Sequence, residues 1–215
     1  MSALRILGID PGTMVVGYAC VEFIERSAEP STSSATPIAR RASNVVRVTA
    51  TGGDARLIEA GALRLPRGAP LGDRLARLVG ELEGWIERFE PQEVALEEAF
   101  CGKSAQAALR IGEARGVVLA TAHRLGRFVH EYPPARIKRA VAGHGAASKE
   151  AVAMMAMRSL GLTRIEGPPD AGDAVAVALC RVEERRSPLR AAVADLDDRL
   201  QSAAFRDRIR RSGGR

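Results

Sequence analysis

Four acidic residues stand where separate segments of the chain begin or end: Asp10, Glu97, Asp170 and Asp173. Asp10 closes the first apolar run, and Glu97 closes a later one. Asp170 and Asp173 open an alanine-rich segment three residues apart, a spacing that places both on one face of a helix. Carboxylate oxygens are the ligands that Mg²⁺ and Mn²⁺ prefer, and two such ions can activate water and stabilise a leaving oxygen. The four acids therefore predict a two-ion site for phosphodiester hydrolysis, with Asp10 as the bridging ligand.

Each acid also has a plainer interpretation. Asp10 precedes Pro11-Gly12 and could be a turn residue that bonds its own backbone. Asp170 and Asp173 could form a capping box at the start of their helix. Glu97 is followed by Glu98, and one of the two could simply be solvated. Singly these signals are weak, and their strength lies in their combination.

The charge balance favours a polyanionic partner. The 215-residue chain carries a formal net charge of +6 and has a pI of about 9.9. Basic side chains release counterions from phosphates on binding, so nucleic acid is the favoured partner, although the same charge also serves solubility.

The cysteines and the apolar runs indicate in which cell compartment the protein is expected. Three cysteines without a C-x-x-C pair indicate neither a disulfide framework nor a zinc site. The first residues lead directly into a strand without the features of a secretory signal, and no apolar run is long enough to span a bilayer. We therefore expect a cytoplasmic protein that does not bind membranes.

Hydrophobic periodicity predicts an α/β fold. Strands are predicted at residues 4–9, 15–23, 57–65, 93–96 and 128–132, and helices at 71–89, 104–124, 135–142, 149–160 and 170–186. Ser148 is expected to cap the helix that follows it. Three strands followed by alternating helices and strands predict a mixed five-stranded sheet with helices on its faces.

Two segments fall outside this pattern. Residues 26–54 are rich in Ser, Thr, Ala and Pro, which predicts a flexible insertion in a hairpin connection. Residues 188–215 are predicted to form a basic, arginine-rich extension, so that residues 1–187 make up a single domain.

Several blocks of the chain resemble the RuvC family of Holliday junction resolvases. They are Gly8-Ile9-Asp10-Pro11-Gly12-Thr13 with Gly17-Tyr18, and residues 95–100, 108–116, 131–138, 143–145 and 170–174. The resemblance implies an RNase H-like fold and paired Mg²⁺-dependent nicks in strands of like polarity at a four-way DNA junction. It also implies a homodimer and cooperation with the branch-migration proteins RuvA and RuvB. The family's catalytic acids correspond to Asp10, Glu97, Asp170 and Asp173.

The resemblance also implies DNA contacts. Phe100 matches an aromatic residue that stacks on bases, although an ordinary core phenylalanine is an equal alternative. Lys103, Lys138 and Lys149 match basic residues near the DNA, and without the resemblance they would be read as solvated lysines.

The helix predicted at residues 104–124 matches the family's dimer helix. Gly116, Ala120 and Ala122 could allow close approach of a second helix, although a core helix would look similar.

Two other functions are open to the sequence. The Gly-Ile-Asp-Pro-Gly-Thr run also resembles the phosphate loop of sugar kinases and actin-like proteins, which indicates a phosphotransferase. Those enzymes need a second half with its own glycine-rich motif, for which 215 residues leave little room. A non-catalytic binder of branched nucleic acid is the second alternative, and the intact set of acids argues against it.

Overall fold

A five-stranded mixed sheet forms the centre of the molecule. The computed structural model describes residues 2–12, 14–25, 53–98, 105–165 and 167–187. The strands are β1 (Ser2–Asp10), β2 (Val15–Glu25), β3 (Ala55–Arg64), β4 (Glu93–Glu97) and β5 (Phe128–Tyr132), in the order β3-β2-β1-β4-β5. The first three pair antiparallel, whereas β4 lies parallel to both β1 and β5. The predicted mixed sheet is confirmed.

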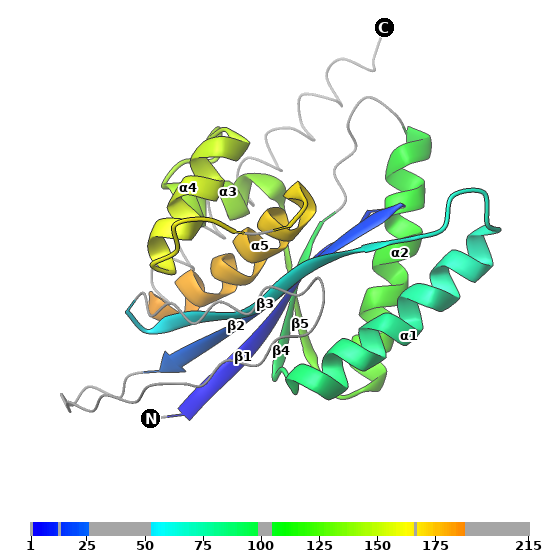
Figure 1. Cartoon of the computed structure of the whole chain (residues 1–215), viewed down its shortest axis with the longest axis horizontal. Coiled ribbons are helices and arrows are strands. Elements are labelled where there is room, and N and C mark those ends of the chain that lie inside the picture. The colour runs from blue at the N-terminus through cyan, green and yellow to red at the C-terminus, as the bar shows by residue number, and fades with distance from the viewer. Residues whose placement is uncertain (1, 13, 26–52, 99–104, 166, 188–215) are drawn as a thin grey trace, which may run out of the picture.

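The helices cover both faces of this sheet (Figure 1). On one face lie α1 (Leu71–Phe89) and α2 (Ala105–Arg124). On the other lie α3 (Pro134–Ala142), α4 (Lys149–Ser159) and α5 (Pro169–Arg186). Each expected helix is present, with ends that differ from the prediction by a residue at most.

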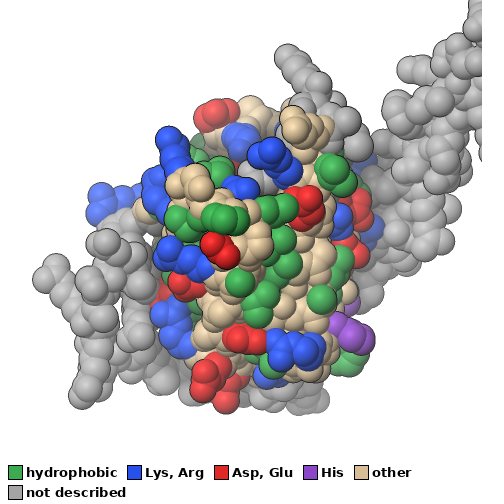
Figure 2. Space-filling view, turned by 90° about the vertical axis from the view of Figure 1, so that its right-hand side faces the viewer, with side chains coloured by type: hydrophobic (Ala, Val, Ile, Leu, Met, Phe, Trp, Pro, Cys, Tyr) green, Lys and Arg blue, Asp and Glu red, His purple; other side chains and the backbone are tan. Residues whose placement is uncertain are grey.

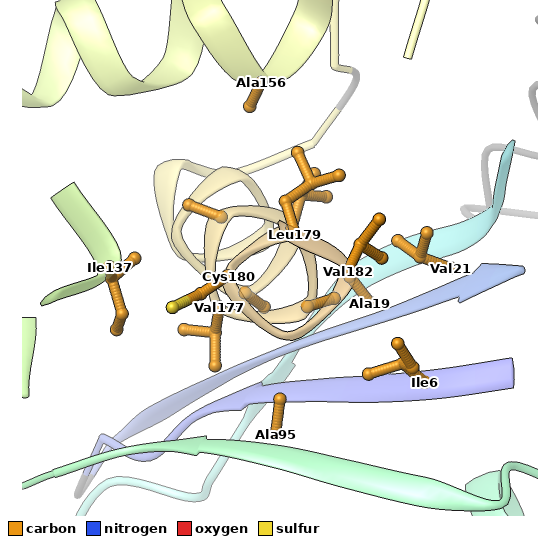
Figure 3. Packing of buried hydrophobic residues seen from close by; sticks show 14 of the residues in the cluster. Ile6, Ala19, Val21, Ala95, Ile137, Ala156, Val177, Leu179, Cys180 and Val182 are labelled. Carbon is orange, nitrogen blue, oxygen red and sulfur yellow. The ribbon is translucent and has the colours of Figure 1, made fainter. Parts of the chain in front are cut away.

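Alternation along β1 divides the core into two layers. Leu7 and Ile9 are buried against α1 and α2, whereas Ile6 belongs to the opposite layer around α5. Successive strand side chains point to opposite faces, so Gly8 and Asp10 also face the α5 side. Figure 3 shows that layer, with Ile6 pointing from β1 toward α5.

The predicted insertion at residues 26–54 ends slightly earlier than expected, because Asp54 belongs to the folded domain. Residues 26–52 lie outside the described part of the chain, but Asp54 does not belong to a loose loop. Its carbonyl accepts a hydrogen bond from Ile24 N–H (2.7 Å), and its carboxylate binds Arg186 at the end of α5. The folded domain therefore resumes by Asp54. The extension predicted at residues 188–215 lies outside the described residues, so the domain boundary stays a prediction.

One smaller expectation is confirmed. Ser148 caps α4, because its Oγ accepts a hydrogen bond from Ala151 N–H at 3.2 Å. Cys20 and Cys180 are buried, whereas Cys101 lies outside the described residues. Among the helices that the structure describes, none is long and apolar enough to cross a bilayer.

Candidate active site

Asp10 and Glu97 lie at the same end of two neighbouring parallel strands. The last recorded pair between β1 and β4 joins Ile9 to Leu96, and each acid follows by one residue. Ala95 of β4 packs in the α5 layer, so alternation places Glu97 on that side as well. The two carboxyl groups share a hydrogen bond. Asp10 is therefore more than a turn residue.

Glycines at the sheet surface bring the start of α5 to these acids. A Cβ atom on Gly8 would lie 2.3 Å from the Ala174 carbonyl oxygen, and one on Gly17 would lie 2.1 Å from the Asp170 carbonyl oxygen. Gly17 is also the strand partner of Asp10. Gly17 lies within β2 and provides space for the first turn of α5.

Asp170 and Asp173 are not capping residues. The helix begins at Pro169, its N-cap is Pro168, and no side chain caps it by a hydrogen bond. The capping-box alternative is therefore wrong. Instead, the negative charges of Asp173 and Asp170 both act on Asp10, which places the first turn of α5 beside the end of β1.

The environment of Asp10 and Glu97 disfavours a second negative charge. Burial, followed by the charge of Asp173, raises the pKa of Asp10 to about 6. Burial, followed by the charge of Asp10, raises the pKa of Glu97 to about 8. The shared hydrogen bond favours ionised Asp10 and protonated Glu97, so the pair holds one proton at neutral pH.

Lys149 contributes a positive charge at the edge of the acidic cluster. Its Nζ lies 2.7 Å from Asp173 Oδ2, and the lysine side chain is 73% exposed. This hydrogen bond is the main reason that the pKa of Lys149 is raised. Lys138 is half-buried on α3. Phe100 and Lys103 lie outside the described residues, so their predicted DNA contacts stay predictions.

The donor set fits a hard divalent cation. Its members are carboxylates in a partly buried setting, where mutual repulsion raises two pKa values, and a bound cation would offset that repulsion. Within the described residues, no three such side chains are drawn together closely enough to form a preformed cation cage. Glu97 shares a hydrogen bond with Asp10, whereas Asp173 is paired with Lys149.

Sequence reasoning missed the contribution of small residues to this site. Ala174 and Ala178 of α5 stand against Gly8, and larger side chains there would hold the helix away from the sheet. The alanine-rich run with two aspartates at its start predicted the helix, but it did not indicate which strand the helix would contact.

The chain also matches a known protein family. The family model described as crossover junction endodeoxyribonuclease RuvC matches residues 36–181. A curated protein of that name from Halorhodospira halophila is 41% identical over 188 residues, which cover 87% of this chain and 95% of the relative. One from Chloroflexus aurantiacus is 40% identical over 177 residues, which cover 82% of this chain and 92% of the relative.

Solved structures with the same fold are also found. Thermus thermophilus RuvC superposes with a TM-score of 0.67 at 30% identity, covering 85% of this chain and 96% of that one. The same protein in complex with a Holliday junction substrate gives 0.63 at 27% identity, covering 85% and 95%. The yeast mitochondrial Holliday junction resolvase, at 13% identity and a TM-score of 0.56, supports the fold alone. The predicted RNase H-like fold is confirmed.

Proposed function

The chain belongs to the RuvC family of crossover junction endodeoxyribonucleases, and we propose that it resolves four-way DNA junctions by hydrolysing a phosphodiester bond in each of two strands of like polarity. The observation that carries this proposal is the meeting of Asp10, Glu97 and the first turn of α5 at one end of the sheet. The chain's net charge of +6 suits a DNA substrate.

We propose that Asp10, Glu97, Asp170 and Asp173 hold two Mg²⁺ ions, which Mn²⁺ could replace. When bound, the ions would supply an activated water and stabilise the leaving oxygen. The proton that Asp10 and Glu97 share must leave before both carboxylates can bind a cation, so cation binding releases a proton. Asp173 must in turn exchange its pairing with Lys149 for the cation. Lys149 is then available to bind a substrate phosphate.

Basic residues on the α5 side are proposed to hold the DNA. Lys149 stands at the N-terminus of α4, where backbone N–H groups and the helix dipole also favour anions. Lys138 lies on the neighbouring helix α3. Both positions suit contacts with phosphates rather than with base edges, because a lysine reads charge more than sequence. Phe100 is proposed to stack on bases at the junction, and Lys103 to contact DNA beside it.

We propose that the protein acts as a homodimer joined through α2. Leu109 is 68% exposed, Gly116 and Ala120 are exposed, and a Cβ on Gly112 or Gly116 would meet no atom within 4 Å. Figure 2 views the side on which α1 and α2 lie, where hydrophobic side chains run down the middle of the face between charged ones. Ala122, which the sequence also suggested for helix approach, is instead fully buried against the sheet.

A junction assay tests the proposed function directly. The protein is incubated with a synthetic mobile four-way junction, with and without Mg²⁺, beside a linear duplex of the same sequence. We expect paired nicks in two strands of like polarity, only with the ion and only in the junction. Junction binding without cleavage under any divalent ion would instead identify a non-catalytic binder. Equal cleavage of the duplex would exclude a structure-specific enzyme.

The branch-migration proteins RuvA and RuvB are proposed partners in the cytoplasm, because family membership implies them. Adding both proteins to the junction assay should change the rate of cleavage or its position. An unchanged pattern over a range of partner concentrations would argue against this assignment.

A further inference from the structure

Two arginines of α5 bind a buried carboxylate at the end of β4 that is opposite the acidic site. Glu93 is only 4% exposed. Arg181 binds it in a bidentate manner: Nε donates to Oε2 at 2.9 Å, and Nη2 donates to Oε1 at 3.1 Å. Arg185 also donates to both oxygens, and His130 Nε2 of β5 lies 3.7 Å from Oε1. Burial alone would raise the pKa of Glu93, but the nearby His130 and the hydrogen bonds from Arg181 and Arg185 outweigh it and hold the pKa well below its usual range.

This ion cluster extends to the next strand and helix through Glu184. The Glu184 carboxylate accepts hydrogen bonds from Arg181 Nη1 (3.0 Å) and from the Tyr132 hydroxyl of β5 (2.5 Å). It also pairs with Arg136 of α3. Arg181 thus links two carboxylates, and the cluster ties α5 to β4, β5 and α3.

The cluster joins the same two elements that carry three of the proposed catalytic acids, Glu97 on β4 and Asp170 and Asp173 on α5. Glu97 follows Glu93 by four residues on β4, a rise of about 13 Å in a strand, and both point toward α5. Arg181 follows Asp173 by eight residues on α5, a rise of about 12 Å in a helix. The two spans nearly match. The ion cluster and the acidic site therefore form the two ends of one contact between β4 and α5.

Between these ends the contact of α5 with the sheet centre is made mainly by small residues, together with Val177. Ala174 and Ala178 approach the backbone at Gly8, and Ala95 is the residue of β4 that points toward α5 in Figure 3. Small side chains let the helix come close to the sheet, but they resist sliding along the helix axis less than interlocked large side chains do. A forked Arg–carboxylate pair has a fixed geometry, so it can supply that resistance.

We propose that Glu93 and Arg181 are positioning residues for the cation site, because they fix α5 along its axis against β4 and so set the distance between Asp173 and Glu97. This inference rests on the proposed two-ion function of the acids. Both residues lie at the opposite end of the contact between β4 and α5 from the acids.

The test measures Mn²⁺ binding to the DNA-free protein by titration calorimetry and electron paramagnetic resonance, together with thermal unfolding. Glu93→Gln removes the charge of the carboxylate, and Arg181→Lys keeps the positive charge but loses the fork. The second variant serves if the first does not fold. The matched control is Glu59→Gln. Glu59 is 1% exposed and binds the Tyr18 hydroxyl (3.0 Å) and Arg88 (2.5 Å), but it ties β3 to β2 and α1 rather than to α5.

We expect Glu93→Gln and Arg181→Lys to weaken Mn²⁺ binding by about 10–100-fold, as supporting residues around metal sites do. Junction affinity measured without a divalent ion should stay within about twofold, because the proposed DNA contacts do not involve Glu93. Glu59→Gln should lower the unfolding temperature but leave Mn²⁺ affinity within about twofold.

Unchanged Mn²⁺ affinity in both variants would overturn the inference, and so would an equal loss in Glu59→Gln, which would mark a general effect of destabilisation. Asp10→Asn separates this inference from the proposed function. If that variant binds Mn²⁺ as the unaltered protein does, the proposed cation site itself is wrong and the positioning role is lost with it. If Asp10→Asn abolishes binding, the result with Glu93→Gln and Arg181→Lys decides the positioning role alone.

Discussion

Glu97 and Asp10 share one proton across neighbouring parallel strands, at the end of the sheet where α5 begins. The pair therefore carries one negative charge at neutral pH rather than two. Such a pair is suited to a cation, because binding replaces the proton and relieves the repulsion between the carboxylates. The adjacent Asp173 is held by Lys149 in the same way, by a positive group that a cation can displace.

Removing one acid should separate cleavage from binding. Asp10→Asn and Asp173→Asn are each expected to lower the rate of junction cleavage by at least about 1000-fold, since the proposed ions lose a charged ligand. Junction affinity in gel-shift assays should stay near that of the unaltered protein, because it depends on basic residues. Cleavage that survives both substitutions would show that these acids do not form the active site.

The metal-free protein should lose stability as the pH rises. Folding raises the pKa of Asp10 from 3.8 to about 6 and that of Glu97 from 4.5 to about 8. The folded state therefore binds more protons than the unfolded state between about pH 4 and pH 8, so the free energy of unfolding falls over that interval. Each unit of pKa shift corresponds to about 1.4 kcal/mol, so the two raised pKa values together correspond to a loss of several kcal/mol.

Thermal unfolding in the presence of a chelator measures this loss. Asp10→Asn should flatten the dependence on pH, whereas Asp73→Asn, an exposed position on α1, should leave it unchanged. Added Mg²⁺ should raise the unfolding temperature more at pH 8 than at pH 5.5. A flat profile for the unaltered protein would contradict the shared proton.

Gly8→Ala should damage both stability and cleavage. The new methyl group would lie 2.3 Å from the Ala174 carbonyl oxygen, so α5 must move away from β1 and carry Asp173 with it. Overpacking of this kind costs about 1–3 kcal/mol, and backbone on both sides leaves little room for relaxation. Gly80→Ala on α1 is the control, because its Cβ would meet nothing within 4 Å and should stabilise the helix by about 0.5–1 kcal/mol. Equal unfolding temperatures for the two variants would contradict the close contact.

Gly116→Leu should block the proposed dimer without harming the monomer. The position is exposed on α2, and a Cβ there would meet nothing within 4 Å. Leucine is a good helix former, so folding should be preserved, but its bulk would keep a second α2 at a distance. Sedimentation analysis should show a dimer for the unaltered protein and a monomer for the variant. Gly84→Leu, an equally open position on α1, should remain dimeric. A dimer that persists in Gly116→Leu would place the interface elsewhere.

Lys149→Gln should reduce the salt dependence of junction binding. Each lost phosphate contact lowers the slope of log affinity against log salt by about 0.9. Arg158→Gln serves as the control, because it removes a positive charge from the exposed surface at the other end of α4. Fluorescence anisotropy over a salt series measures both slopes without divalent ions in the Asp173→Asn background, where Lys149 is released from its ion pair. A slope unaffected by Lys149→Gln would remove this lysine from the DNA interface.

Local sequence patterns determined much of this protein. Hydrophobic residues alternate along buried strands and recur every 3.6 residues along buried helices. This spacing predicted the five strands, the helices and the mixed sheet. The acids were found for the same reason, since each closes or opens an element. The family blocks around Asp10 and Glu97 then indicated the chemistry.

The tertiary structure alone decided how those elements meet. The role of Gly17 follows from the first turn of α5 lying on it, and the exclusion of Asp170 as a cap follows from where the helix begins. The pairing of Arg181 with Glu93 joins residues 88 positions apart. A local pattern records the preference of a segment for helix or strand, but partners at such separations depend on how packed faces align, and that alignment exists only in the folded chain.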